Sequence, residues 1–362
     1  MEPVPNAPTL PNSKVIQAII WQADYATQNN APITSRTVRA QLALVRGATR
    51  VGQRIAGWPD TAMEDALPLR LNGALHNLHL TGRDDRLAPI FAGELTEQDA
   101  VDRVIGDVVA DHDAALLPWL DGPPQTNEAG RSASIMAALH WLSGKLGLSA
   151  RLGPRFELNE LGASAGVNTM MDRFAFDLGG VVSGVADSPL RVAPEWRGPP
   201  PPGDPVTIEA IRGCDRAPLD LTDPAQALRL KAFIWPDTPV RMARLDAAIA
   251  LARVRPPRLD RCDAGDWVAA RLAAPQAIGT TRVVFHSIVW QYLPEATRDA
   301  ITADIEAAGA LATAARPLAW VRLETNRTTF RHELSVRYWP GGDDEVVLGA
   351  AHAHGAWVEW FR

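Results

Sequence analysis

The sequence is poor in cysteine and has no long hydrophobic run. It contains only two cysteines, Cys214 and Cys262, in 362 residues, too few for a disulfide framework or a four-ligand zinc site. No apolar stretch approaches the ~20 residues that span a membrane. Residues 1–10 lack the basic segment and apolar run of a secretory signal. We therefore expect a soluble cytoplasmic protein with reduced thiols and no membrane partner.

An excess of basic charge is also absent. The formal net charge is −6, and general nucleic-acid binding requires a basic surface that neutralises phosphates. Apolar residues make up 46% and charged residues 22% of the chain, as in ordinary globular proteins. The length of 362 residues exceeds one typical domain of roughly 100 to 200 residues, which predicts two lobes or one enlarged domain. The expected partner is a small molecule.

The hydrophobic pattern changes near residue 150. Residues 14–150 space their apolar side chains as helices do, so we expect a helical N-terminal lobe over residues 1–150. Residues 151–362 alternate short apolar runs with helical stretches, which predicts an α/β domain with a mostly parallel sheet. The strands predicted there cover residues 156–161, 206–213, 258–262, 282–287 and 318–324.

Three smaller features complete the predicted organisation. Residues 332–339 and 345–348 flank Pro-Gly-Gly-Asp-Asp and predict an antiparallel C-terminal hairpin, followed by strand-like sequence at 357–360. Residues 181–205 look like an insertion, with a hairpin and a proline run that cannot form a central strand. Five arginines fall on one side of a predicted helix, which we interpret as a solvated face: Arg36, Arg39, Arg46, Arg50 and Arg54.

The loop after the first predicted strand supports two chemistries. Glu160, Gly162, Ser164 and Gly166 fit the acidic-x-Gly-x-Ser-x-Gly loop on which class I S-adenosylmethionine (SAM) methyltransferases hold their cofactor. Glycines allow close approach of the backbone to a ligand, and the helix expected to follow offers unpaired N–H groups. The same residues spell Gly-x-Ser-x-Gly, the nucleophile elbow of serine hydrolases. A third interpretation is tight packing alone.

Polar residues also end the later predicted strands, at Asp215, Asp263 and His286. Ligands of open α/β sheets gather at the carboxyl ends of strands, where an acidic side chain binds ribose. Asp215 lies 55 residues after Glu160, whereas about 20 is usual, and the insertion accounts for part of the excess.

The hydrolase alternative has a chain order in its favour and two absences against it. Ser164, Asp263 and then His352 or His354 follow the Ser, Asp, His order of α/β-hydrolases. The chain before the elbow reads as helical, however, and no His-Gly-Gly-Gly segment is present. For His76 we expect an interior hydrogen-bonded histidine, and we expect no metal at the paired histidines near the C-terminus.

Motifs across nearly the whole chain form a recognisable set, at residues 69–76, 125–132, 160–168, 172–173, 212–215, 235–236 and 354–357. Together they resemble a bacterial family catalogued only as domain of unknown function 2332. The second half is similar to class I SAM-dependent methyltransferases, which implies a Rossmann-like sheet and SAM as cofactor. The residues that this resemblance and the strand-end pattern assign to the cofactor are Glu160, Gly162, Ser164, Gly166, Asn168, Asp215, Asp263 and Ala264.

The leading hypothesis is methyl transfer to a small molecule held between the helical lobe and the α/β domain. His286 is the predicted general base, with Glu324 or Tyr292 as helpers. The predicted acceptor-binding residues are Asn127, Glu128, Arg131 and Gln291. No Asn-Pro-Pro-Tyr motif follows the fourth strand, so methylation of a nucleobase amine is disfavoured. The alternatives are a serine hydrolase and a non-catalytic nucleotide-binding protein of the same fold.

Overall fold

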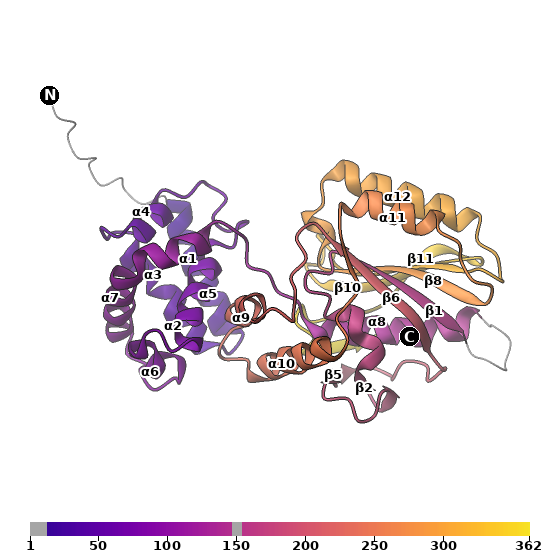
Figure 1. The fold of residues 1–362 in the computed structure, drawn as a ribbon, viewed down its shortest axis with the longest axis horizontal. Helices are drawn as coiled ribbons and strands as arrows, with labels where there is room; N and C mark the ends of the chain where they lie inside the picture. The colour runs from indigo at the N-terminus through magenta and orange to yellow at the C-terminus, as the bar shows by residue number, and fades with distance from the viewer. Residues whose placement is uncertain (1–12, 147–153) are drawn as a thin grey trace. The chain divides into compact units, whose positions relative to one another are not determined.

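A computed structural model describes residues 13–146 and 154–362, which form two compact units. Unit 1 comprises residues 1–126 and 225–242, and unit 2 comprises residues 127–224 and 243–362. Figure 1 shows the chain coloured from the N-terminus to the C-terminus. The chain therefore divides before the expected boundary at residue 150, and a later segment returns to unit 1. The prediction about a secretory signal concerns residues 1–10, outside the described range.

Unit 1 is helical, as its apolar spacing predicts. Its elements are α1 (Ser13–Gln28), α2 (Pro32–Arg39), α3 (Gln41–Leu44), α4 (Arg50–Ala56), α5 (Leu67–Leu80), η1 (Asp85–Leu87), α6 (Ala88–Phe91), α7 (Gln98–Leu116), η2 (Leu117–Leu120) and most of α9 (Pro224–Ala232). Their apolar faces enclose a core of fully buried side chains that includes Leu71, Leu75 and Ile105. No described helix is both long enough and apolar enough to cross a membrane.

Two predictions in unit 1 have clear outcomes. His76 is an interior histidine: its side chain is buried, Nδ1 lies 3.1 Å from the carbonyl oxygen of Ala232, and burial lowers its pKa to about 4. The prediction that one helix carries the five arginines is wrong, because this segment is divided into α2, α3 and α4. Arg39 pairs with Asp24 and Arg54 with Asp121, so these two arginines serve local ion pairs.

Unit 2 is built on a nine-stranded sheet in the order β5-β12-β11-β10-β9-β8-β1-β6-β7. The strands are β1 (Arg155–Leu161), β5 (Glu195–Arg197), β6 (Thr207–Asp215), β7 (Leu259–Arg261), β8 (Thr280–Ser287), β9 (Leu318–Thr325), β10 (His332–Trp339), β11 (Gly342–Ala351) and β12 (Trp357–Trp360). The run β7-β6-β1-β8-β9 is parallel throughout. The predicted α/β class with a mostly parallel sheet is confirmed.

The chain reverses its direction of travel across the sheet between β1 and β8. From β1 it proceeds outward to β6 and β7, then returns to place β8 on the other side of β1 and continues to β9. This is the strand order of doubly wound folds, in which ligands bind outside the carboxyl ends at the reversal. A ligand site is therefore expected at the loops that follow β1 and β8.

Helices cover both faces of the sheet. Figure 1 shows α11 (Ala264–Ala273) and α12 (Glu295–Ala310) on one face and α8 (Ser132–Leu146) on the other. Because both faces are covered, every residue of β8 is buried, including the polar side chains of Thr281 and His286. Its one charged side chain, Arg282, donates to three carbonyl oxygens and lies 3.4 Å from a carboxylate oxygen of Glu157 on β1.

The C-terminal hairpin is present, and the insertion is more structured than predicted. β10 pairs antiparallel with both β9 and β11. A separate small sheet combines β2 (Ala175–Leu178), β3 (Val181–Gly184) and β4 (Arg191–Val192). β5, inside the predicted insertion, pairs with β12 and forms one edge of the large sheet. The remaining elements are η3 (Ala129–Arg131), η4 (Asn168–Arg173), η5 (Trp290–Tyr292) and α10 (Pro239–Val254).

Candidate functional site

The loop after β1 takes the sharply turned path that its small residues predict. Gly162, Ser164 and Gly166 all have positive φ, at 63°, 53° and 75°. The N–H of Ala163 donates to the carbonyl of Cys214 on β6, so the loop is tied to the neighbouring strand. It leads into η4, a six-residue 3-10 helix. The helix expected to follow the loop is therefore present only as this short 3-10 helix.

The two loop glycines are covered by protein atoms. A Cβ on Gly162 would lie 2.3 Å from Cγ2 of Val289, and a Cβ on Gly166 would lie 2.8 Å from Cβ of Pro257. The space that a side chain would need is already filled at both positions. Close packing thus accounts for the presence of both glycines. Any contact between this loop and a cofactor must therefore come from the backbone and side chains around them.

Three side chains, one at the end of β1, one in the loop and one at the start of η4, contain buried polar atoms that lack hydrogen-bond partners among the described residues: Oε2 of Glu160, Oγ of Ser164 and Oδ1 of Asn168. We call Glu160, Ser164 and Asn168 the rim cluster. Nδ2 of Asn168 donates to Oε1 of Glu160 across 3.3 Å. A buried polar atom without a partner costs about 1–3 kcal/mol, and such atoms in native structures commonly have a water or ligand partner.

The electrostatics of Glu160 are dominated by burial. Its side chain is 2% exposed, and desolvation raises its pKa to about 8. Asn168 and the positive charge of Arg131 oppose this rise, and the negative charge of Asp215 adds to it. The carboxyl group is therefore largely protonated near neutral pH. A cationic group placed beside it would favour the charged form.

The acidic residues at the ends of β6 and β7 bond to the backbone. One oxygen of Asp215 accepts from the N–H of Ser164 at 2.8 Å and the other from the N–H of Ala217 at 2.9 Å. Asp263 caps α11 by accepting from the N–H of Gly265. Ala264 is the buried first residue of that helix. Asp215 therefore orients the loop of the rim cluster, and Asp263 serves a structural cap.

His286 lies at the end of β8 with both ring nitrogens bonded. Nδ1 lies 2.6 Å from Oε1 of Glu324, and Nε2 accepts from the indole N–H of Trp320 at 3.1 Å. Its side chain is fully buried and stacks on Trp290. A general base needs a free lone pair that faces its substrate. The geometry therefore favours a structural histidine at this position and does not favour the predicted base.

The predicted helpers are dispersed. Glu324 bridges His286 and the backbone N–H of Val289, which fixes the loop after β8 against the end of β9. Tyr292 is 72% exposed in η5, and Gln291 beside it is also exposed. Neither contacts the rim cluster through any hydrogen bond that the described residues form.

Two of the three predicted acceptor-binding residues before α8 lie beside the β1 and β8 loops. Oδ1 of Asn127 accepts from the N–H of Val167, immediately before η4. Arg131 donates to the carbonyls of Ser287 and Ala353, and its charge acts on Glu160. Glu128 is buried, caps η3 and pairs with Arg244 at 3.0 Å. Glu128 is therefore the cap of η3, and Asn127 anchors the loop before η4.

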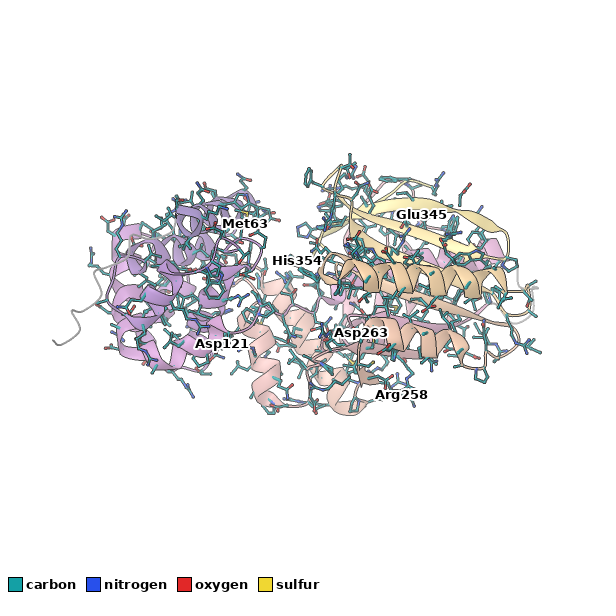
Figure 2. The ribbon with its side chains drawn as sticks, turned by 90° about the horizontal axis from the view of Figure 1, so that it is seen from above. Met63, Asp121, Arg258, Asp263, Glu345 and His354 are labelled. Carbon is teal, nitrogen blue, oxygen red and sulfur yellow. The ribbon has the colours of Figure 1, made fainter. Side chains whose placement is uncertain are left out.

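The hydrolase geometry is not assembled. Ser164 has the positive φ of a nucleophile elbow, but its Oγ has no hydrogen-bond partner among the described residues, histidines included. Asp263, the expected acid, caps a helix. Figure 2 labels Asp263 and His354, which belong to the loops after β7 and β11. Within the described part of the chain, no group of three or more His, Cys, Asp or Glu side chains is arranged to hold a metal ion.

Sequence reasoning missed His332, the first residue of β10. It pairs in register with Thr325 on β9 and Ala351 on β11, and its Nδ1 lies 3.0 Å from Oγ1 of Thr325. Its position at the start of a predicted hairpin strand was the available signal.

Cys214 and Cys262 are free thiols, and burial raises the pKa of both.

Comparison with known proteins identifies a family without a described activity. No curated protein and no solved structure matches the chain significantly. The family described as "Uncharacterized protein conserved in bacteria (DUF2332)" matches residues 17–360. That match covers nearly the whole length, so the chain belongs to this family.

Proposed function

We propose that unit 2 binds SAM at the rim cluster and transfers its methyl group to a small molecule. The observation that carries this proposal is the set of three buried polar atoms without partners among the described residues, on the end of β1, the loop that follows it and the start of η4. This loop lies where the strand order reverses, the position at which doubly wound sheets bind nucleotide-like ligands. The antiparallel strands after β9 also support a methyltransferase-like sheet.

The residues of the rim cluster fit the polar end of such a ligand. Oε2 of Glu160 and Oδ1 of Asn168 offer acceptors for an ammonium group, and Oγ of Ser164 offers a donor or an acceptor for a carboxylate or hydroxyl. Asp215 already accepts two backbone N–H groups, so only its remaining lone pairs are available to a ribose hydroxyl. SAM would supply an activated methyl group, and the protein would contribute orientation of the acceptor.

Glu160 gives this proposal a thermodynamic signature. The ligand's ammonium group would lower the pKa of the buried carboxyl, which is about 8 without a ligand. Binding at pH 7 would then release a proton from Glu160. Calorimetric titrations in two buffers of different ionisation enthalpy should give different observed heats, and the difference should vanish in Glu160→Gln.

The direct test is calorimetric titration of the full chain with SAM and with its demethylated product. We expect binding by the wild type and a loss of about 10-fold or more in Glu160→Gln, since one hydrogen bond to a charged group contributes about 1.5–3 kcal/mol. Glu209→Gln is the matched control, because Glu209 lies near the start of β6 and pairs with Arg155. No heat and no thermal shift at millimolar ligand would contradict the proposal. Fluorophosphonate labelling that is lost in Ser164→Ala would favour a hydrolase instead.

A further inference from the structure

His332 occupies the sheet edge at which β9 ends and β10 begins. Its partner in register, Thr325, is the last residue of β9, and Oγ1 of Thr325 lies 3.0 Å from Nδ1. The described residues form no hydrogen bond with Nε2, and this atom is not among the buried atoms that lack a partner. Nε2 of this half-buried side chain therefore reaches solvent, while Nδ1 is anchored.

This arrangement differs from that of His286, two strands away. His286 is fully buried, and both of its nitrogens are bonded, to Glu324 and Trp320. A base must combine a fixed ring orientation with an accessible lone pair. Of these two histidines at the carboxyl edge of the sheet, His332 meets both conditions and His286 meets only the first.

One charged group acts on both His332 and a member of the rim cluster. The guanidinium of Arg131 acts on both Glu160 and His332, and the carboxylate of Glu324 acts on His332 with the opposite sign. Desolvation, as the largest cause, together with Arg131 lowers the pKa of His332 below its usual 6.5. The imidazole is therefore neutral at pH 7, as a proton acceptor must be. Positive charge nearby also favours an oxyanion over its protonated form.

We propose that His332 is the catalytic base, and that it accepts through Nε2 the proton of a small-molecule hydroxyl. The proton moves from the acceptor's oxygen to Nε2 and leaves an electron pair on that oxygen as the nucleophile. That pair would form the new O–CH₃ bond while the S–CH₃ bond of bound SAM breaks and leaves its electron pair on sulfur. The imidazolium then returns the proton to water. Nδ1 keeps its own hydrogen and donates it to Oγ1 of Thr325 throughout. This inference rests on the proposed function and names the acceptor class, a molecule with an ionisable O–H such as a phenol.

The geometry makes a spectroscopic prediction that does not depend on turnover. Because Nδ1 bonds to Thr325, the neutral ring of His332 should carry its hydrogen on Nδ1, and ¹⁵N chemical shifts of the labelled full chain distinguish this tautomer from the Nε2–H form. His332→Gln assigns the signal. Thr325→Val should shift the population toward Nε2–H. The matched control is Thr329→Val, because the Thr329 hydroxyl bonds to Glu333 in the same hairpin region.

Activity is measured as transfer of a radiolabelled methyl group from SAM to a panel of phenols between pH 5.5 and 8.5. We expect His332→Gln to lower the rate by about 100-fold or more and to leave the affinity for demethylated SAM within about twofold, while Thr329→Val retains both. The acidic limb of the wild-type rate profile should follow the pKa of His332 measured by NMR. Other groups near this histidine are Arg131, Glu324, Glu333 and His352, so the NMR value is needed to assign the limb.

The outcomes separate the two proposals. SAM binding and methyl transfer that are unchanged in His332→Gln would overturn the role of His332 and leave the proposed function intact. A predominant Nε2–H tautomer in the wild type would overturn it as well. Absence of SAM binding in the wild type would remove the proposed function and, with it, this role.

Discussion

Replacement of Glu160 by glutamine should change how the stability of unit 2 depends on pH. The carboxyl of Glu160 has a pKa of about 8 in the folded chain, whereas its ordinary value is 4.5. The folded state therefore binds this proton more tightly than the unfolded state does, and the free energy of unfolding falls as pH rises between these two values. Below the ordinary value both states are protonated, and the contribution is complete.

The size of the effect follows from the difference between the two pKa values. Each pKa unit corresponds to about 1.4 kcal/mol, so a rise from 4.5 to about 8 sets an upper limit of roughly 5 kcal/mol on the loss. Water entry and side-chain rearrangement reduce this to a few kcal/mol in practice. Glutamine has nearly the same shape and no titrating group, so Glu160→Gln should lack this pH dependence.

Urea unfolding followed by circular dichroism at pH values from 5 to 8.5 measures the effect. The wild type should lose stability relative to Glu160→Gln as pH rises, and Glu209→Gln, an exposed ion-pair partner, should follow the wild type. If wild type and Glu160→Gln run parallel across this range, Glu160 is not a buried protonated carboxyl. The rim cluster would then hold a charge, and the argument for proton release on ligand binding would fail.

Two further substitutions test the loop after β1. Gly162→Ala places a Cβ 2.3 Å from Cγ2 of Val289 at a φ of 63°, so it should lower the free energy of unfolding measured in urea by about 1–3 kcal/mol. The double variant with Val289→Ala should recover part of this loss. An unchanged stability would show that the two loops separate easily. Asp215→Ala leaves the N–H groups of Ser164 and Ala217 without their acceptor, so it should lower stability by about 1–3 kcal/mol and weaken SAM binding in calorimetry. The control is Asp172→Ala, because Asp172 in η4 pairs with Arg255 and not with this loop, and equal effects of the two variants on SAM binding would count against a loop-orienting role.

Much of the sheet follows from local pattern, and its edges do not. β9 contains the apolar run Leu-Ala-Trp-Val, β8 contains Val-Val-Phe, and β1 alternates Phe156 and Leu158 with polar residues, so each of these strands has a recognisable local pattern. β5 has only three residues and pairs with β12, which follows it by more than 150 positions in the sequence. No local preference marks a three-residue strand whose stability depends on a partner so distant in the chain.

The predicted helix boundaries in unit 1 were wrong for a related reason. The arginines of residues 36–54 keep a helical spacing, yet α2 ends at Arg39 and α4 starts only at Arg50. The start of α4 is capped locally by Thr49, whose hydroxyl accepts from the N–H of Gly52, and also by Asp113 of α7, whose carboxylate accepts the N–H groups of Arg50 and Val51 from 62 to 63 positions away. The contribution of Asp113 comes from another helix, and spacing alone cannot show it.

In the candidate site, too, the sequence locates the residues but does not show which groups they bond to. The sequence correctly marks Glu160, Asp215, Asp263 and His286 as polar residues at strand ends, because strand ends can be located from pattern. What each side chain does depends on its lateral neighbours. Asp263 caps its own helix, whereas His286 is bonded on both sides by residues of β9, and only the order β8-β9-β10 brings them together.

The same strand order explains why His332 becomes a candidate only in three dimensions. Its neighbours in the sequence, Arg331 and Glu333, suggest an ordinary solvated hairpin, and the pairing with Thr325 that fixes Nδ1 requires the register of β9 against β10. A histidine anchored through one nitrogen and open at the other differs functionally from one bonded at both. The order and register of β8, β9 and β10 determine which nitrogens of His286 and His332 are bonded. A measurement of the tautomer of His332 therefore tests directly whether this histidine, and not His286, can act as the base.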